Sequence, residues 1–301
     1  MIKKPMKAPS TSITDEQLDM LPYPVYGSVK LDGYRCTTMN GAFTSSMKKI
    51  TNDYIQGILS QPEYSGLDGE LIVGAPNDPD VFNNTTGPVR RKVGEPDFTF
   101  YVFDNIACDL SLPYGVRLDL LNESILPPGV QVLEQKLLGD PQAVIDFTQW
   151  CVDNDYEGGM IRTREGRYKQ GRCTFKEMNI FKRKPVEDDE CVVIGFEEQM
   201  LNGNEVYTDE LGLNVRSAHK ENKVGKGTLG ALVVKSALWD EPFAIGTGIG
   251  LTDNVRKYIW DNQNKFMGSL WTYKYQKYGS INAPRQPIAK GMRDINDITK
   301  Y

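Results

Sequence analysis

One lysine stands where a predicted β-strand ends. Lys30 follows alternating, strand-like residues, and Asp32-Gly33 then marks a turn, with Arg35 five residues after the lysine. Strand periodicity predicts that Lys30 and Asp32 lie on one face. A solvated lysine before an Asp-Gly turn explains this segment equally well when it is taken alone. The segment therefore suggests, without deciding, a site built on an amine, a carboxylate and a guanidinium group.

Other predicted strands also carry charged side chains among apolar residues. These are Asp68 and Glu70 in the strand over 67–73, Glu157 ahead of an apolar strand, and Lys182 and Lys184 after Ile180. Charged groups in buried strands need partners or a function. The spacing of Lys182 and Lys184 predicts that two ammonium groups converge on one point. For Glu70 and Glu157, a structural ion pair is the alternative interpretation.

The composition narrows the chemistry that these residues can perform. The five cysteines are an odd number and scattered, which argues against a disulfide framework and a four-cysteine zinc site. With a single histidine, His219, a Ser-His-Asp triad is not expected. Catalysis would then depend on lysine, arginine and carboxylates, with a hard cation. The net charge of −5 argues against a protein that binds nucleic acid over its whole surface, although local basic grooves remain compatible with it.

The elements that must position these groups divide into two predicted domains. Helices are predicted at 14–18, at 52–61 and after Asp140, and an aromatic strand at 98–104. Pro185 and the acidic run 187–190 mark the predicted boundary. Beyond it, the short β segments 191–196, 229–234, 243–245 and 270–275 favour a small barrel, interrupted by a polar insertion over 199–227.

Basic residues dominate between Arg162 and Lys184, with Tyr168, Phe175 and Phe181 among them. This pattern is typical of a surface that follows a phosphate backbone, and a solvated face is the alternative. No apolar run reaches the roughly 18 residues of a membrane span, and the N-terminus has no signal-peptide pattern. We therefore expect no membrane contact and a cytoplasmic protein, in the host cytoplasm if the source is a virus.

Taken in order, these segments resemble the nucleotidyltransferase motifs of ATP-dependent DNA ligases. Motif I corresponds to Lys30–Arg35, motif III to Asp68–Glu70, motif IIIa to Tyr101–Asp104, motif IV to Glu157–Ile161 and motif V to Phe181–Lys184. Pro5–Ala8 resembles the Pro-Met-Leu-Ala lead-in of the family, and Ala283–Pro287 with Arg293-Asp294 resembles motif VI. The resemblance covers nearly the whole chain and looks most like bacteriophage and other minimal ligases.

The resemblance implies an α+β fold with two domains. A nucleotidyltransferase domain over 1–186, with ATP-grasp-like antiparallel sheets and helices, would precede an OB-fold β-barrel domain over 187–301 that carries a basic insertion around 199–227. It also implies ATP as cofactor, nicked duplex DNA as partner, and a monomer.

The resemblance further assigns roles to individual residues. Lys30 would form the lysyl-AMP phosphoramidate, Glu70 would hold the ribose hydroxyl, Phe103 would stack on adenine, and Val29, Lys182 and Lys184 would bind the nucleotide. Glu157, with Glu70, would bind the metal, Asp32 and Arg35 would act at the nick phosphate and the 3′-hydroxyl, and Arg293 with Asp294 would orient pyrophosphate. Tyr101 lies on the same face as Phe103 and is the alternative stacking ring.

Lysine chemistry supports the same assignment. Attack by a lysine needs the unprotonated amine, which neighbouring cations and partial burial favour. Lys182, Lys184 and Arg35 are candidate neighbours. The same cations would stabilise charge on the α-phosphate, and Mg²⁺ or Mn²⁺ held by carboxylates and water would complete the site.

One departure concerns the grip on DNA. The family usually has an arginine after the motif I strand, where this chain has Ser45. Either Lys48 or Lys49 replaces its phosphate contact, or the nick 5′-phosphate is held more weakly. The insertion supplies a second basic cluster, predicted to contact DNA, formed by Arg216, Lys220, Lys223 and Lys226.

Other functions share parts of this pattern. An RNA ligase or an mRNA capping guanylyltransferase uses the same lysine chemistry, although Arg35 and the ligase-like C-terminal segment favour a DNA ligase. A non-catalytic nucleotide- or DNA-binding relative would belong to a different class.

Overall fold

The fold was analysed in a computed structural model of the chain. It describes residues 2–184, 186–208, 214–216, 222–248, 250–276, 280 and 282–293. Contacts divide the chain into two units, Met1–Pro185 and Val186–Tyr301. Within the described ranges, no helix is both long and apolar enough to cross a lipid bilayer.

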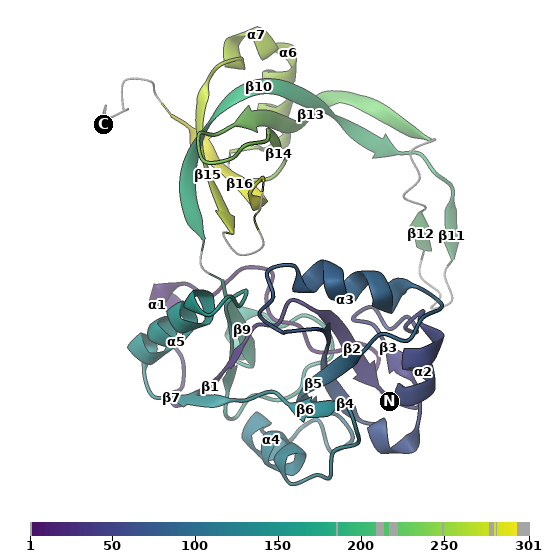
Figure 1. Ribbon diagram of the computed structural model, residues 1–301. Coiled ribbons are helices and arrows are strands. Elements are labelled where there is room, and N and C mark those ends of the chain that lie inside the picture. The colour runs from purple at the N-terminus through teal and green to yellow at the C-terminus, as the bar shows by residue number, and fades with distance from the viewer. Residues whose placement is uncertain are drawn as a thin grey trace. The chain divides into compact units, whose positions relative to one another are not determined.

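Two sheets form the framework of the first unit (Figure 1). The antiparallel sheet β7-β1-β8-β9 consists of Lys136–Leu138, Val25–Val29, Gly159–Thr163 and Ile180–Arg183. The other sheet, β3-β2-β4-β5-β6, consists of Ala42–Phe43, Tyr34–Thr38, Leu67–Val73, Phe98–Asn105 and Val130–Val132, and β6 pairs with β5 in parallel. Charged residues that approach one another across these two sheets form the site described below.

Helices pack around these sheets. They are α1 (Asp15–Leu18), α2 (Asp53–Leu59), α3 (Val81–Arg90), α4 (Tyr114–Asn122) and α5 (Pro141–Asp153), with 3₁₀ turns at Pro62–Tyr64 and Phe175–Glu177. The three predicted helices, α1, α2 and α5, are confirmed. The Asn52 side chain caps α2 by accepting a hydrogen bond from the Ile55 amide at 2.9 Å, and the Asp140 side chain caps α5 by accepting one from the Ala143 amide at 2.8 Å.

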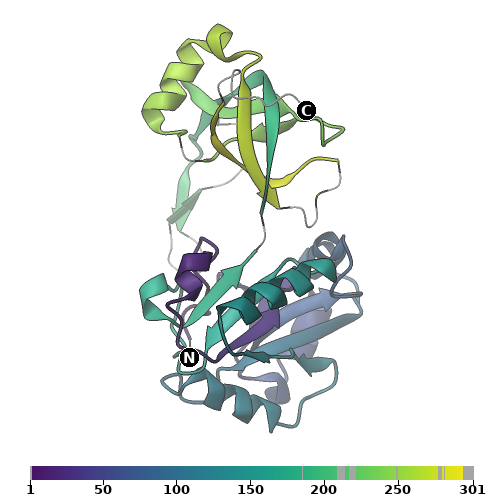
Figure 2. The same cartoon turned by 90° about the vertical axis from the view of Figure 1, so that its left-hand side faces the viewer.

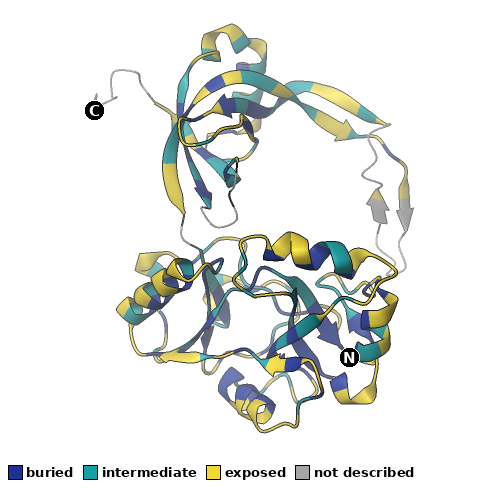
Figure 3. Cartoon of the chain, viewed as in Figure 1, coloured by how far each residue is buried: buried dark blue, intermediate teal, exposed yellow. Residues whose placement is uncertain are grey.

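The apolar stripe of α5 explains how this helix is held. Val144, Phe147 and Cys151 are buried and pack in one core with Val25 of β1 and Ile161 of β8. The stripe therefore fixes the sheet from which Lys30 and Glu157 project. Figure 3 shows the same contrast throughout the first unit, with largely buried strands and helices that expose one side.

The second unit contains a strongly curved five-stranded sheet (Figure 2). Its order is β14-β13-β10-β15-β16, with strands at Phe243–Ile245, Lys223–Lys235, Glu187–Asn202, Leu270–Gln276 and Arg285–Met292. A parallel bridge between Gly248 and Ala289 links the segment after β14 to β16, the strand at the other edge. Two helices, α6 (Asp253–Asp261) and α7 (Gln263–Phe266), accompany the sheet.

The acidic run 187–190 directly follows the division between the two units and lies in β10. Pairing with β15 gives its carboxylates partners: the Tyr275 hydroxyl donates a hydrogen bond to Glu187 at 2.8 Å, and the Tyr273 hydroxyl donates one to Asp189 at 2.8 Å. The expectation that the segment 199–227 interrupts the barrel needs correction. The segment 199–227 does not interrupt the sheet. Instead, β10 and β13 extend into it as one long hairpin, beyond which lie β11 (Val206–Thr208) and β12 (Asn214–Arg216).

Candidate active site

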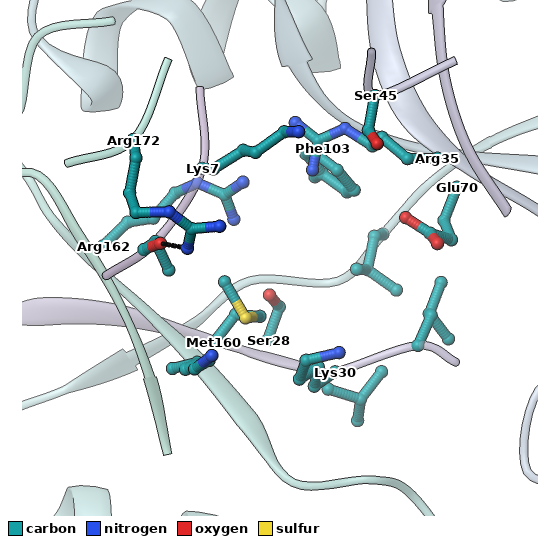
Figure 4. A pocket seen from close by; sticks show the side chains of 15 residues that line it. Lys7, Ser28, Lys30, Arg35, Ser45, Glu70, Phe103, Met160, Arg162 and Arg172 are labelled. Atoms are coloured by element: carbon teal, nitrogen blue, oxygen red, sulfur yellow. Dashed lines mark hydrogen bonds between the residues drawn. The ribbon is translucent and has the colours of Figure 1, made fainter. Parts of the chain in front are cut away.

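A pocket of about 280 Å³ lies between the two sheets of the first unit (Figure 4). One sheet contributes Ser28, Val29, Met160, Arg162 and Lys182, and the other contributes Arg35, Glu70 and Phe103. Lys30, directly after β1, also lines it. Several cations thus face one carboxylate, which makes the pocket suited to an anionic ligand.

The amine of Lys30 is held by a buried carboxylate. Its ammonium group donates to one oxygen of Glu157, and the ammonium group of Lys184 donates to the other. The Glu157 side chain is only 2% exposed. Desolvation opposes ionisation of Glu157, but the two ammonium groups outweigh it and lower its pKa. Lys30 and Lys184 therefore converge on Glu157, while Lys182, the other lysine of the predicted pair, lines the pocket beside Lys30.

A glycine makes this arrangement sterically feasible. Gly158 adopts a φ of +140°, and a Cβ there would lie 2.4 Å from the carbonyl oxygen of Arg183. The carbonyl oxygen of Gly158 also accepts a hydrogen bond from the Lys30 amide at 2.8 Å. Since any side chain would push the two segments apart, Gly158 allows Glu157 to sit between Lys30 and Lys184.

Arg35 is fixed by a buried acid. Its Nε and Nη2 donate to the two oxygens of Asp68 at 2.8 Å each, and the Tyr168 hydroxyl donates to the same carboxylate at 2.7 Å. Asp68 is fully buried. This bidentate pair holds the guanidinium plane at the pocket wall. Of the two acids in the strand 67–73, Asp68 therefore has a structural role.

Glu70 lies next to Arg35 because β2 and β4 pair in the register Arg35–Glu70. Burial raises the pKa of Glu70 to about 7, although the charges of Arg35 and Lys30 oppose this rise. Asp32 is buried, and its charge also raises this pKa. Near neutral pH, Glu70 is therefore partly protonated and can donate as well as accept a hydrogen bond.

The ring that faces the pocket is Phe103 rather than Tyr101. Phe103 stands at a register shift between β4 and β5 and is 7% exposed. The guanidinium carbons of Arg35 and Arg162 lie 4.5 Å and 4.7 Å from its ring centroid. A planar group that stacks on this ring would therefore meet guanidinium groups as well.

Other predicted residues are not brought to this pocket. Lys48 and Lys49 are exposed and do not line it, and Arg216, Lys223, Lys226 and Arg293 belong to the second unit. Lys220 and Asp294 lie outside the described residues. Arg293 pairs with Glu190 at 3.2 Å, while Arg216 donates to the carbonyls of Asn202 and Asn204 at 3.2 Å and 2.8 Å, which braces the hairpin.

Three cations that line the pocket, Lys7, Arg162 and Arg172, were not predicted as site residues, although the last two belong to the basic stretch between Arg162 and Lys184. Arg162 is 2% exposed, and its Nε has no hydrogen-bond partner within the described structure. The signal that singled out Glu70, a charge inside an apolar strand, applies equally to Arg162. Lys7 and Arg172 are brought to the pocket by a pairing between distant segments, which no local pattern reveals.

The acids present fit a metal only in combination with a ligand. The described residues contain no group of three or more His, Cys, Asp or Glu side chains that could hold a metal ion. Mg²⁺, however, commonly binds one or two carboxylates together with substrate phosphates and water. Glu70 and Glu157 influence each other's charge and suit such a partial site.

Comparisons with known proteins agree with this architecture. A sequence model of the ATP dependent DNA ligase domain matches residues 5–184, and one of the DNA ligase OB-like domain matches residues 222–293. The expected nucleotidyltransferase and OB-like domains are thus confirmed.

Individual relatives are more distant. A probable DNA ligase of Mycolicibacterium vanbaalenii is 26% identical over 212 residues, which are 64% of this chain but only 39% of that relative. The structure of the Chlorella virus DNA ligase-adenylate is 25% identical, with 99% of this chain and 100% of the other covered and a TM-score of 0.54. A Lig E DNA ligase, 21% identical with 97% and 100% covered, reaches a TM-score of 0.69 and shares the fold.

Proposed function

Because the chain belongs to the family of ATP-dependent DNA ligases, we propose that it seals nicks in duplex DNA through an adenylate carried on Lys30. The observation that supports this most directly is the pocket in which Lys30 is held by Glu157 beside Lys182 and Lys184. We further propose that the protein acts as a monomer.

In the first step, the Lys30 amine attacks the α-phosphorus of ATP. A nitrogen–phosphorus bond forms, the bond from the α-phosphorus to the bridging oxygen breaks, and pyrophosphate leaves with the electron pair. The Lys30 ammonium group must lose one proton before the attack and a second as the nitrogen–phosphorus bond forms. The Glu157 carboxylate, which contacts it, would accept the first, and the second would pass to solvent. Lys182 and Lys184 would stabilise charge on the α-phosphate.

In the second step, an oxygen of the DNA 5′-phosphate attacks the same phosphorus and releases Lys30, which gives an adenylylated 5′-phosphate. In the third, the 3′-hydroxyl attacks the DNA phosphorus, and AMP leaves as the phosphodiester forms. We assign Arg35 to these two steps, because its pair with Asp68 fixes a guanidinium group that can hold a phosphate. Asp32 would act near the 3′-hydroxyl.

The nucleotide would be recognised by the remaining pocket residues. Glu70 would hold the ribose hydroxyls, Phe103 would stack on adenine, and Val29 would contact the base from β1. The pocket position of Phe103 supports its choice over Tyr101. Arg293, in the second unit, would orient pyrophosphate.

A divalent ion fits this site, and we propose Mg²⁺, with Mn²⁺ as a substitute. Glu70 and Glu157 would hold it together with the nucleotide phosphates. When bound, the ion would neutralise charge on the phosphates.

The long hairpin of the second unit would contact DNA through its basic residues. Lys223 and Lys226 stand on β13, and Lys226 is exposed. Positive side chains on an extended hairpin can neutralise backbone phosphates without reading sequence. Arg216 would contribute as well, although it also braces the hairpin.

A sealing assay tests this function and separates it from its relatives. The full chain, with Mg²⁺, is given duplex DNA with one 5′-phosphorylated nick and ATP, GTP or NAD⁺ in turn. We expect sealed product with ATP but not with GTP or NAD⁺. Consumption of GTP without sealing would indicate a capping enzyme, and consumption of no nucleotide would indicate a binding protein. A parallel assay uses the same nick in RNA strands, and product from RNA but not from DNA would indicate an RNA ligase.

A further inference from the structure

Ser45 stands where the family motif leads one to expect an arginine, yet it lines the pocket. The following inference rests on the proposed ligase function and concerns what holds the nick 5′-phosphate in place of that arginine. Ser45 also lines a second, adjoining cavity, together with Arg35 and Glu70. The position is therefore at the site, but its side chain is short and uncharged.

The structure places the nearby lysines away from the pocket. Residues 44–48 form a tight turn, in which the Thr44 amide donates to the Lys48 carbonyl at 2.8 Å and Met47 has a φ of 62°. Lys48 and Lys49 are exposed after this turn, and neither lines either cavity. A phosphate contact by Lys48 or Lys49 would therefore lie outside these two cavities, whereas another cation already lines the pocket beside Ser45.

Lys7 reaches the pocket from the N-terminal segment. Its backbone is fixed on both sides, because its amide donates to the Gly171 carbonyl at 2.9 Å and its carbonyl accepts from the Cys173 amide at 2.8 Å. The preceding Met6 amide donates to the Tyr168 hydroxyl at 3.1 Å. Figure 4 shows the Lys7 side chain on the same side of the pocket as Ser45, pointing toward Arg35, with Lys30 on the other side.

The charge of Lys7 is not balanced by an acid. Lys30 and Arg35 pair with Glu157 and Asp68, whereas no acid of the described first unit pairs with Lys7. Desolvation and the charges of Arg172 and Arg35 lower the pKa of Lys7. A half-buried cation among other cations is unfavourable unless an anion joins it. The matching residue of the family lead-in that Pro5–Ala8 resembles is an apolar leucine, so packing alone does not require a lysine here.

We propose that Lys7 supplies the cation that holds the nick 5′-phosphate in this protein, in place of the arginine that Ser45 replaces. Its ammonium group, with Arg172 beside it on the paired segment, would bind the phosphate oxygens at the Ser45 side of the pocket. The phosphate would then lie across the pocket from Lys30, where the adenylate is formed.

The test compares binding of two nicked duplexes that differ only in a 5′-phosphate or a 5′-hydroxyl, without divalent ions so that no transfer occurs. We expect Lys7→Met to reduce the preference for the phosphate about tenfold, the loss expected for one hydrogen bond to a charged group. Lys7→Arg should keep the preference, and Ser45→Arg should restore it in the Lys7→Met background. Lys4→Met, an exposed lysine of the same segment, is the matched control.

The outcomes separate this inference from the proposed function. If the wild-type protein seals nicks but Lys7→Met keeps the wild-type preference for the 5′-phosphate, Lys7 does not hold that phosphate. If Lys7→Met loses the preference for the 5′-phosphate and Ser45→Arg does not restore it, Lys7 does not take the place of an arginine at position 45. If the wild-type protein neither takes up AMP nor seals, the function itself fails. Thermal unfolding checks that Lys7→Met folds, and Lys7→Gln provides a second neutral variant.

Discussion

The ammonium group of Lys30 donates to the carboxylate of Glu157, whose other oxygen is bound by Lys184. The carboxylate is 2% exposed, so one buried negative charge holds two positive ones. This arrangement fixes the position of the amine on which the proposed chemistry depends. It also connects β8 and β9 to the end of β1, so the site and the fold of the first unit share one interaction.

Replacement of Glu157 by glutamine should destabilise the protein. The two ammonium groups would lose their counter-charge, and breaking a buried pair typically costs about 3 kcal/mol or more. Urea unfolding measures this loss. The double variant Glu157→Gln/Lys184→Met removes one of the two cations and should recover part of it. Equal stability of the single and double variants would show that the shared charge is unimportant.

The stability contribution of Glu70 should depend on pH. Burial raises its pKa from 4.5 to about 7, so between these values the folded protein keeps a proton that the unfolded chain loses. Stability therefore falls as the pH rises through this interval. The glutamine of Glu70→Gln does not titrate. As the pH rises from 4.5 to 7, the free energy of unfolding of this variant should therefore increase relative to that of the wild-type protein by up to about 3 kcal/mol. The exposed Glu63→Gln is the control and should show no such gain.

Arg35→Lys keeps the charge but loses the fork that binds Asp68. Lysine cannot form two parallel bonds to one carboxylate, so both the buried acid and the bound phosphate would be held less well. We expect transfer of AMP to a nick to slow by about a hundredfold or more, and unfolding free energy to fall by about 2–4 kcal/mol. Single-turnover transfer from the adenylylated protein measures the first effect. Wild-type transfer by Arg35→Lys would argue against the assigned role.

The basic hairpin should determine the salt dependence of DNA binding. Neutralising Lys223 and Lys226 to glutamine should weaken nick affinity and lower the slope of log K against log salt by about one for each phosphate that the variant no longer neutralises. Lys257→Gln is a suitable control, because Lys257 lies on α6 and pairs with Asp261 at 2.6 Å. An unchanged slope in the double variant would exclude this hairpin as a DNA-contacting arm.

Local signals predicted part of the fold. The helix after Asp140 was predictable because an N-cap, a proline and an apolar stripe agree. The helix α3 was not, because Val81–Arg90 is largely polar and contains Gly87 and Pro88. The acidic run at 187–190 was predicted only as the mark of a domain boundary, and its place in a strand depends on Tyr273 and Tyr275 of β15, which donate hydrogen bonds to it. Tertiary partners decided the cases in which local preference failed.

The residues of the site also fall into those that local sequence patterns could identify and those that depend on tertiary pairing. Lys30, Glu70 and Lys182 could be found because each is a charge in or at the end of a predicted strand, whereas Phe103, one of several aromatic residues in its strand, was found only through the family resemblance; all four line the pocket. Asp68 stands out equally but binds Arg35 instead. Lys7 could not be found, since its place depends on pairing with the segment around Arg172. Sequence patterns identify charges that need a partner, whereas the fold determines which partner each one receives.

In the proposed mechanism, Lys30 carries the adenylate. Incubation of the protein with Mg²⁺ and ATP labelled at the α-phosphate, followed by denaturing electrophoresis, tests it most directly. We predict a covalently labelled band in the wild-type protein that disappears in Lys30→Ala and is released when a 5′-phosphorylated nick is added. Absence of label in the wild-type protein, or label that persists in Lys30→Ala, would show that Lys30 does not carry the adenylate.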